Sequence, residues 1–386
     1  MHTVSWEHAY DACPPEAADL LRAVSVLDVP ALASPAVGAA AGLTAEQAAA
    51  GLAGLAETGW TDGERHTLPA PARAWLTGHA AGLVAPRRAA EIVREFAEYH
   101  AAAVDPDRRT AVEVRAWLAG HRAEIVAAVA ACDRDGLRPH GIRLASTVWP
   151  EAGLVNDPAW WDALAEAGEA VAVAAHDPAG LAELLHRSAT VFAAKGDRLR
   201  AEAQWVRALA VARRRLREHP DDAEDRDRAA AILAALRGLY HDWGRPAKAL
   251  DAEQELVELH RSAGDELAAA EALSRVAATL YAVGRTDGAA DYFALADEAM
   301  AAAGGAPGQH ARILLWTGRA LWELGRHGHA RRQWHRALAM TVDVDDAVAD
   351  HARALLATAP DAPLPEGYPI PAGSPNTSSS ESGGPG

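Results

Sequence analysis

The feature of this sequence that most limits its fold is a short phrase that occurs four times in the C-terminal half. Each copy has a Gly, an Ala five residues later, a large side chain four residues after that, and an Ala or Leu three residues further on. The copies begin at Gly196, Gly244, Gly284 and Gly325. A period of roughly 40 to 50 residues is typical of stacked helical pairs, which pack against their neighbours and present an extended surface to partners.

The composition favours the same class of fold. Half of the 386 residues are hydrophobic, only 5% are aromatic, and alanine dominates the apolar set. No window alternates apolar and polar residues for long, so we expect a nearly all-α chain. Its length exceeds one ordinary core, which predicts two or three folding units.

The segment 1–80 has the pattern of a winged helix, in which three helices are followed by a β-hairpin. Helix starts are marked by Pro and by a Thr in N-cap position, and a helix end is marked by Gly. The expected elements are helices over 14–27, 35–41 and 45–59 with Thr44 as N-cap and Gly59 at the end, a hairpin over 60–68 with its turn at Asp62-Gly63, and a helix from Pro71.

Winged helices commonly read DNA, but this segment is acidic. The third helix offers Glu46, Gln47 and Glu57 and contains no basic residue, although base edges and phosphates need Arg, Lys, Asn or Gln. Residues 1–80 hold three Lys or Arg against nine Asp or Glu. Phosphate neutralisation requires clustered cations, so docking on a protein is the favoured use and DNA binding the alternative.

Helical patterns continue from Pro86 to the end of the repeats. Helices are expected over 86–104, 110–132, 141–149 and 159–175, the last two forming a degenerate repeat. The segment from Pro360 to Gly386 is rich in Pro, Gly and Ser, which predicts a disordered tail. The predicted domains are a winged-helix unit over 1–80, a helical connector over 81–135, a repeat solenoid over 136–359 and the tail over 360–386.

The repeated phrases resemble tetratricopeptide repeats, in a form longer than the usual one of about 34 residues. Together with SWEHAYDACPPEAADLLRAVSVL from Ser5 and AWLAGHRAEIVAAV from Ala116, they make the stretch 5–359 similar to the C-terminal half of the AfsR-like actinobacterial signal-transduction NTPases. That resemblance implies an all-α fold in which a winged helix precedes a right-handed tetratricopeptide solenoid that acts as a sensor.

Two departures from this family concern its nucleotide. The family binds nucleotide at a P-loop upstream of the winged helix, and no GxxxxGK[ST] occurs in this chain. The family also ends its wing with an apolar-His-Asp motif that senses the nucleotide. Here Leu68, Pro69 and Ala70 stand in that place, followed by the expected Arg73 and the aromatic Trp75. Because Pro and Ala side chains cannot hydrogen-bond to a phosphate, we expect no nucleotide, no cofactor and no nucleotide-binding domain.

No residue pattern indicates a catalytic or metal site. Cys13 and Cys132 have no metal spacing and are expected to be buried reduced thiols. His327, His329 and His335 lack the i, i+4 spacing of metal ligands and lie among arginines, so a solvated basic face, or a contact for an anion or acidic peptide, is the better interpretation. The arginines of 207–217 complement a helix C-terminus, and the acidic loop 221–227 can neutralise them.

The predicted site is the groove of the repeat array. In tetratricopeptide arrays the first helix of each pair lines the concave surface, which points to one set of polar and aromatic residues. Tyr281 and Trp322 have an alternative assignment as core residues between helices. The predicted groove residues are Glu183, His186, Thr190, His241, Asp242, Glu271, Ser274, Tyr281, Arg312, Arg319, Trp322 and Glu323, with Gly238 beside them.

The sequence thus predicts a non-enzymatic adaptor or regulator that binds a protein or peptide in this groove and docks through its winged helix. The alternatives are a transcription regulator that reads DNA, or the partner half of a split signalling NTPase. The sequence contains no secretory leader and no apolar run long enough to cross a membrane, so a soluble cytoplasmic protein without membrane or nucleic-acid partners is expected.

Overall fold

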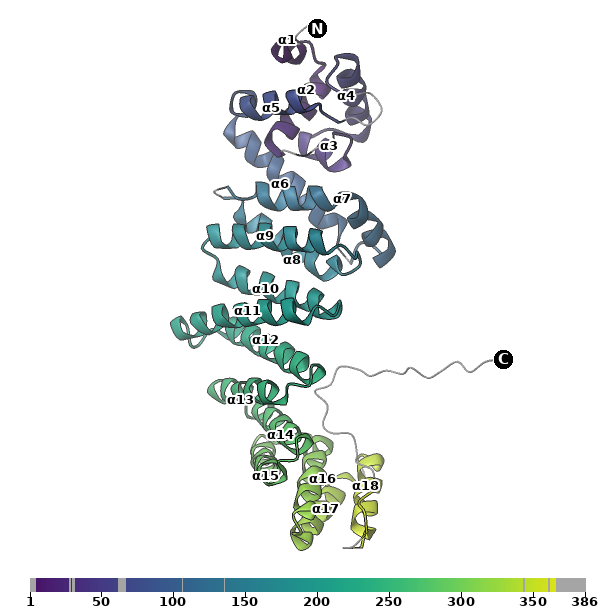
Figure 1. The fold of residues 1–386 in the computed structure, drawn as a ribbon, viewed down its shortest axis with the longest axis vertical. Helices are drawn as coiled ribbons and strands as arrows, with labels where there is room; N and C mark the ends of the chain where they lie inside the picture. The colour runs from purple at the N-terminus through teal and green to yellow at the C-terminus, as the bar shows by residue number, and fades with distance from the viewer. Residues whose placement is uncertain are drawn as a thin grey trace, which may run out of the picture. The chain divides into compact units, whose positions relative to one another are not determined.

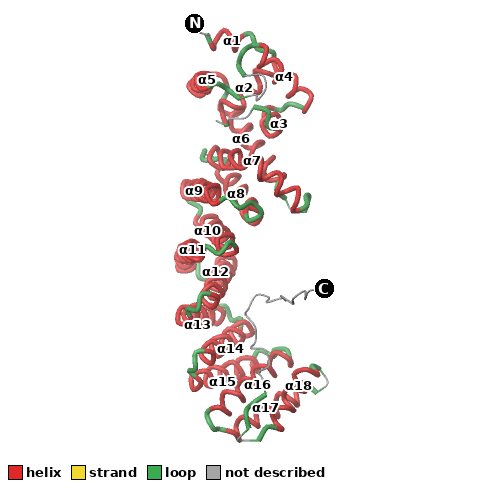
Figure 2. Tube along the Cα trace, turned by 45° about the vertical axis from the view of Figure 1, so that its right-hand side comes forward, coloured by secondary structure: helices red, strands yellow, loops and turns green. Residues whose placement is uncertain are grey.

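The computed structural model describes residues 5–27, 29, 32–61, 67–105, 107–134, 136–342, 344–359 and 362–365. Every regular element among these residues is an α-helix, as the sequence predicts (Figure 2). The chain divides into two compact units, Met1–Val211 and Ala212–Gly386, and the division falls within α11 (Arg198–Glu218). It coincides with none of the predicted domain boundaries, which therefore remain predictions.

The first unit contains ten complete helices among its described residues (Figure 1). Here α2 packs against α3, α4, α5 and α6, and from α6 onward each helix packs on the next one or two in the chain. The bounds are α1 Trp6–Asp11, α2 Pro15–Leu27, α3 Pro35–Ala41, α4 Ala45–Glu57, α5 Ala70–Leu83, α6 Pro86–Ala103, α7 Ala111–Ala131, α8 Arg138–Ala152, α9 Pro158–Ala174 and α10 Pro178–Ala194.

The helices predicted for the winged-helix segment are all present. Thr44 and Gln47 form a reciprocal capping box at the start of α4, which satisfies two orphan N–H groups. Gly59 follows the helix with a φ of 76°, a left-handed conformation that glycine adopts without strain. The predicted turn at Asp62-Gly63 lies outside the described residues, so the wing remains a prediction. One unpredicted helix, α1, brings the Trp6 ring to 5.0 Å from that of Trp60.

The second unit is a run of helices in which each packs on its neighbours in the chain. Pairs of similar length, α12 with α13, α14 with α15 and α16 with α17, make a helical repeat, and α18 closes the series (Figure 1). The bounds are α12 Ala223–Asp242, α13 Pro246–Ser262, α14 Glu266–Ala282, α15 Thr286–Ala302, α16 Pro307–Glu323, α17 His327–Thr341 and α18 Asp346–Ala357.

The fourfold phrase now has a physical explanation. Each of its glycines lies in the turn between the two helices of a pair, with a φ between 66° and 81°. The Ala five residues later is fully buried in all four copies, where its small side chain lets the helices approach closely. The large residue four positions further is also buried in each copy, so the phrase encodes a turn and a helix–helix interface. These interface residues are Ala201, Ala249, Ala289 and Ala330, then Trp205, Glu253, Phe293 and Trp334.

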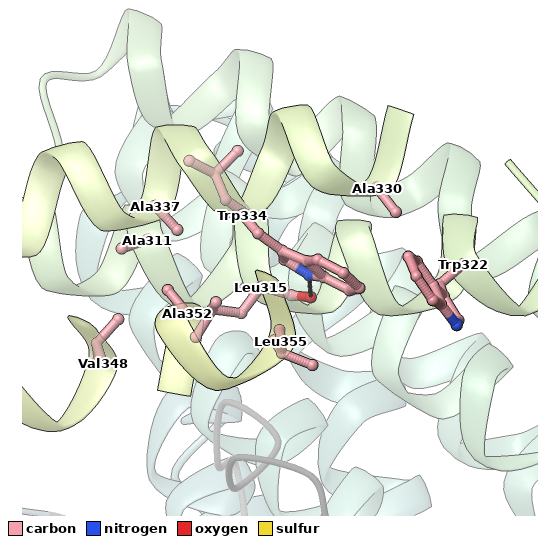
Figure 3. Packing of buried hydrophobic residues seen from close by; sticks show 10 residues of the cluster. Ala311, Leu315, Trp322, Ala330, Trp334, Ala337, Val348, Ala352 and Leu355 are labelled. Atoms are coloured by element: carbon pink, nitrogen blue, oxygen red, sulfur yellow. Dashed lines mark hydrogen bonds between the residues drawn. The ribbon is translucent and has the colours of Figure 1, made fainter. Parts of the chain in front are cut away.

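The last pair shows how a large side chain fits this interface. Trp334 of α17 is fully buried, and its indole N–H donates to the Leu315 carbonyl of α16 at 3.2 Å (Figure 3). A Cβ on Gly318 would lie 2.2 Å from the indole nitrogen, so only glycine leaves room for the ring. Trp334 also packs on Trp322, with ring centroids 5.2 Å apart. α16, α17 and α18 share one apolar core in this way.

Part of the predicted disordered tail makes defined contacts. Leu364 packs on the core that α16, α17 and α18 share, and the Pro365 carbonyl accepts a hydrogen bond from Arg319 at 3.0 Å. The disordered tail over 360–386 stays a prediction, and within it 362–365 makes these two contacts with an apolar surface and a guanidinium that the repeats supply. The rest of the predicted tail lies outside the described residues.

Two further findings concern membrane-spanning helices and the two cysteines. Among the described residues no helix has both the length and the apolar character needed to cross a bilayer. Neither cysteine forms a disulfide, but only Cys132 is buried as predicted, and burial raises its pKa to about 12. Cys13 is partly exposed, because the short helix α1 does not cover it completely.

Candidate functional site

The twelve predicted groove residues fall into two groups that belong to different units. Glu183, His186 and Thr190 lie on α10 of the first unit. The other nine lie at the C-terminal end of α12 and along α14 and α16 of the second unit, which are the first helices of its pairs.

The α10 residues make several contacts within their own unit. Glu183 pairs with Arg187 at 2.5 Å, one helical turn away. His186 accepts a hydrogen bond from the Trp205 indole at 3.1 Å, and the exposed Thr190 hydroxyl donates to the His186 carbonyl. These contacts fix α10 and its neighbour, so they support a structural role for the group.

A buried carboxylate organises the region around His241. Glu253 of α13 is only 1% exposed, and its Oε1 accepts a hydrogen bond from the Thr279 hydroxyl of α14 at 3.0 Å. The same oxygen lies 3.1 Å from Nε2 of the exposed His241 at the end of α12. Asp242 is exposed beside it. Three helices therefore meet at one carboxylate, of which Oε1 is hydrogen-bonded and Oε2 is buried without a partner among the described residues.

A cavity of about 150 Å³ lies between α14 and α16. Arg275 and Arg312 both line it, as do two residues that pair with each other: the Gln309 amide donates to Glu271 at 3.3 Å. Ser274 lines the cavity as well, and its hydroxyl donates to the Glu271 carbonyl. Polar side chains from two successive first helices thus converge on one opening, as the groove prediction requires.

The arginines of this cavity have long ion pairs, and Arg312 Nη2 lies 3.5 Å from Asp345. Arg275 lies 3.7 Å from Glu271, whereas Arg336 elsewhere in the unit contacts Asp297 through two hydrogen bonds of 2.7 and 3.0 Å. Burial, together with the nearby Arg237 guanidinium, lowers the pKa of Arg275. A partly buried guanidinium with a long ion pair and a cationic neighbour gains most from a well-placed carboxylate.

A second polar cluster, at the C-terminal ends of α14 and α16, joins Tyr281, Arg319 and Glu323. The Tyr281 hydroxyl donates to the Glu323 carboxylate and accepts from Arg319 Nε, the latter at 3.1 Å. Burial and the Glu323 carboxylate raise the pKa of Tyr281. The Tyr281 ring meets Trp316 edge-on at 5.3 Å. Tyr281 and Arg319 are half-buried and Glu323 is exposed, and Arg319 uses Nη1 for the chain's own Pro365 carbonyl.

One predicted groove residue belongs to the core. Trp322 is 6% exposed and packs between Trp334 and His327, whose ring centroids lie 5.2 and 4.2 Å away (Figure 3). It therefore exposes too little surface to contact a partner, and its alternative assignment as core is correct. Trp322 lies three residues from Arg319 on α16, where the apolar face of the helix turns toward α17.

The first unit contains a buried cluster of Ser, Glu and His that spacing did not indicate. Ser34 Oγ donates to Glu124 Oε2 at 2.6 Å, and His100 Nε2 lies 3.6 Å from the same oxygen. Burial lowers the pKa of His100 to about 3, with a smaller contribution from His121. Burial raises the pKa of Glu124. The serine contacts the carboxylate, not the histidine, and His100 is fully buried, so the cluster lacks the order and access of a nucleophilic triad.

A hollow of about 630 Å³ lies beside Leu68 and Ala70, two of the residues compared above with a sensing motif. Leu68 and Ala70 line it, and Arg73 is the only charged lining residue among those that the structure describes. Nearby, Trp75 stacks on His79 with ring centroids 4.5 Å apart. The Leu68 and Ala70 side chains that line this hollow cannot hydrogen-bond.

The two basic clusters are held mostly by ion pairs. Arg215 contacts the buried Asp225 at 2.7 Å, which confirms the predicted neutralisation. The predicted acidic loop 221–227 is wrong from Ala223 onward, because Asp222 caps α12 and Asp225 lies in its first turn. In the last repeat Arg331 donates to the Thr358 carbonyl. His327 stacks on Trp322, and within the described ranges no group of His, Cys, Asp or Glu is arranged to hold a metal ion.

Several residues of these clusters were not found from the sequence. Glu253 had a signal, because the other three copies of the phrase have Trp or Phe at its position and a carboxylate there needs buried partners. Arg275 and Gln309 face the cavity from positions near predicted ones, on helices whose exact rotation the repeat spacing does not determine.

Comparison with known proteins gives limited information. No protein-family model matches the chain, and none of the curated proteins matches it. Among solved structures it is similar to BtubC (BKLC) from P. vanneervenii, with 23% identity and a TM-score of 0.37 over 50% of this chain and 76% of that one.

A second similar structure is a signal-transduction ATPase with numerous domains and a tetratricopeptide repeat sensor, from Pyrococcus horikoshii. It has 12% identity and a TM-score of 0.40, covering 92% of this chain and 62% of that one. The chain thus spans less than two thirds of the length of this ATPase. With TM-scores this low, neither likeness carries an argument about function.

Proposed function

We propose that this protein is a non-catalytic adaptor or regulator that binds a protein or peptide through α12, α14 and α16. The observation that carries the proposal is the cavity between α14 and α16, where Arg275 and Arg312 line one opening with Glu271 and Gln309. Convergent polar side chains on successive first helices are what an extended peptide requires of a repeat array.

The electrostatics of the cavity suggest the chemistry of the partner. An acidic side chain or terminal carboxylate of the partner would give Arg275 a shorter contact than its 3.7 Å approach to Glu271. The exposed His241 and Asp242 at the end of α12 would contact neighbouring parts of the same peptide. Specificity would then come from alternating cationic and anionic side chains along the surface formed by α12, α14 and α16.

The proposal gives the N-terminal helices a docking role. The exposed positions of α4 include Glu46, Gln47 and Glu57, and the Gln47 side chain is already used in the capping box. An uncharged or acidic helix face cannot neutralise phosphates, which supports docking over DNA binding. Salt-dependent binding to duplex DNA would instead support the alternative of a transcription regulator.

The non-catalytic part of the proposal is supported by the pairing of the buried charges. Glu253 is engaged by Thr279 and His241, and Asp297 by Arg336 and by His310 at 2.6 Å. A general base must reach a substrate proton, and groups engaged in this way inside helix interfaces cannot.

The test is partner recovery with variants of the cavity. The double variant Arg275→Ala/Arg312→Ala should lose the proteins that copurify with the wild-type chain, at least tenfold by quantitative mass spectrometry. Arg353→Ala is the matched control, because Arg353 is an exposed arginine of α18 that pairs locally with Asp350. Equal recovery by the double variant and the control, with unchanged circular dichroism, would refute the proposed groove. Stoichiometric copurification of a P-loop protein would favour a split signalling NTPase.

A further inference from the structure

The segment after α18 returns to the surface of the repeats. The chain leaves the helix at Thr358, whose carbonyl accepts a hydrogen bond from Arg331 of α17 at 2.9 Å. The Ala362 N–H donates to the Ala359 carbonyl at 3.0 Å. These two contacts direct 362–365 back toward α16.

Two residues of this segment are held by the repeats. The Leu364 side chain packs on the apolar core that α16, α17 and α18 share, and it is half-buried there. One residue later, the Pro365 carbonyl accepts a hydrogen bond from Arg319 Nη1 at 3.0 Å. An apolar anchor and a main-chain hydrogen bond at adjacent positions are how a repeat surface holds an extended peptide.

The Arg319 side chain is already oriented for this contact by its neighbours. Arg319 also donates through Nε to the Tyr281 hydroxyl at 3.1 Å, and it lies 3.9 Å from Glu323. The guanidinium is therefore oriented by groups on both α14 and α16. All three are residues that the sequence predicted for the partner groove, yet it is a segment of the same chain that binds Arg319.

The bound segment is well suited to this kind of site. Pro363 and Pro365 flank Leu364, so two of the three residues have no N–H and a restricted φ. Such a segment loses little conformational entropy when it binds in an extended form, and its main chain offers mostly carbonyl acceptors. Arg319, which can only donate, is a matching partner.

We propose that 362–365 is an intramolecular ligand that masks the Tyr281–Arg319–Glu323 end of the groove, and that this end takes extended Leu-Pro peptides. The inference deepens the proposed function, since it gives the groove a built-in competitor. The ligand class differs from that of the Arg275–Arg312 cavity, because the contacts here are one apolar side chain and one carbonyl.

The effect of the tethered segment on the affinity for an external peptide can be estimated from its effective concentration. A segment joined to α18 by a few residues has an effective concentration on the order of 1 mM. If the same peptide binds in trans with a Kd of about 0.1 mM, the tether masks the site about tenfold. Releasing the segment should therefore tighten binding of an external copy by about that factor.

The experiment uses the full-length chain and a fluorescein-labelled synthetic peptide with the sequence of 358–368, followed by anisotropy. Leu364→Asp, which removes the apolar anchor of the segment, should bind the peptide about tenfold more tightly than the wild type. The double variant Leu364→Asp/Arg319→Ala should lose that binding at least tenfold. Arg353→Ala in the Leu364→Asp background is the matched control and should bind as the parent does.

Two results would overturn the inference: equal peptide affinity of the wild type and Leu364→Asp, or full binding without Arg319. Arg319→Gln, which keeps a polar side chain of similar reach, replaces the alanine variant if the latter changes the circular dichroism spectrum. Because the probe is the chain's own peptide, the outcome does not depend on an external partner. Failure of the proposed function would appear only with the Arg275 and Arg312 variants.

Discussion

Replacing His100 with leucine should remove much of the acid sensitivity of the first unit. His100 on α6 is fully buried, and neither of its ring nitrogens has a hydrogen-bond partner among the described residues. Burial lowers its pKa to about 3, whereas an unfolded histidine titrates near 6.5. The folded state therefore excludes a proton that the unfolded state binds.

The sign and size of the effect follow from this difference. Since the folded pKa lies below the unfolded one, the unfolded state gains protons first, and stability falls as the pH drops below 6.5 toward 3. Each pH unit in this window costs about 1.4 kcal/mol. Between pH 7 and pH 5 the loss is about 2 kcal/mol, or about thirtyfold in an opening equilibrium.

Glu124 acts in the opposite direction. Burial raises its pKa, so the folded state binds a proton more readily than the unfolded state as the pH approaches 4.5. That gain offsets part of the loss from His100 as the pH falls. Glu124→Gln should therefore make the acid loss of the wild type steeper.

Hydrogen exchange of peptides from α6 and α7, corrected for intrinsic rates, measures the local opening free energy. In the wild type these peptides should lose about thirtyfold in protection between pH 7 and pH 5, and in His100→Leu most of that loss should vanish. Comparing two pH values cancels the packing change, including the lost edge contact with Phe96 at 4.7 Å. His329→Leu, on an exposed histidine of α17, should behave as the wild type. An equal pH-dependent loss in His100→Leu would refute the assignment.

The remaining predictions concern the second unit and are read from urea unfolding. Gly318→Ala should cost about 1–3 kcal/mol, because its Cβ would meet the Trp334 indole, whereas Gly238→Ala, in open space on α12, should gain about 0.5–1 kcal/mol. Equal effects of the two would contradict the packing argument. Asp297→Asn should cost about 1–3 kcal/mol at pH 7, because it takes a carboxylate from Arg336 and His310. Burial opposes ionisation of Asp297, but Arg336 and His310 lower its pKa on balance, so the cost should shrink as the pH falls below 3.8. A cost independent of pH in that range would exclude the ion pair as its cause.

The repeat spacing predicted much of the fold because it reports short-range physics. A glycine with positive φ and an alanine that permits close approach are local requirements. The turn role of Gly325 and the interface role of Ala330 could therefore be predicted from the sequence alone. The helix ends at Thr44 and Gly59 were predictable for the same reason, since capping is decided within a single helical turn. The helix α1 was not, because it depends on an aromatic contact with the distant Trp60.

The candidate site was predicted less completely because exposure on a helix changes within one turn. Arg319 and Trp322 are three residues apart on α16, yet one contacts the tail and the other is core. A groove pattern transferred by spacing cannot separate them, since the rotation of each helix is set by its neighbours. Glu253 illustrates the complementary case, in which a residue that breaks the repeat pattern marks a polar junction between three helices.

The contacts of Leu364 and Pro365 show that composition alone does not decide whether a tail segment binds to the rest of the chain. A segment rich in Pro and Gly cannot form a core of its own, and that argument holds for the chain as a polymer. It does not apply where the neighbouring repeats already supply an apolar surface and an oriented guanidinium, because then one leucine and one carbonyl suffice for a contact. The two prolines that exclude regular secondary structure also lower the entropy lost on binding. The same composition that predicts disorder is therefore also compatible with the proposed role of 362–365 as a ligand of the groove.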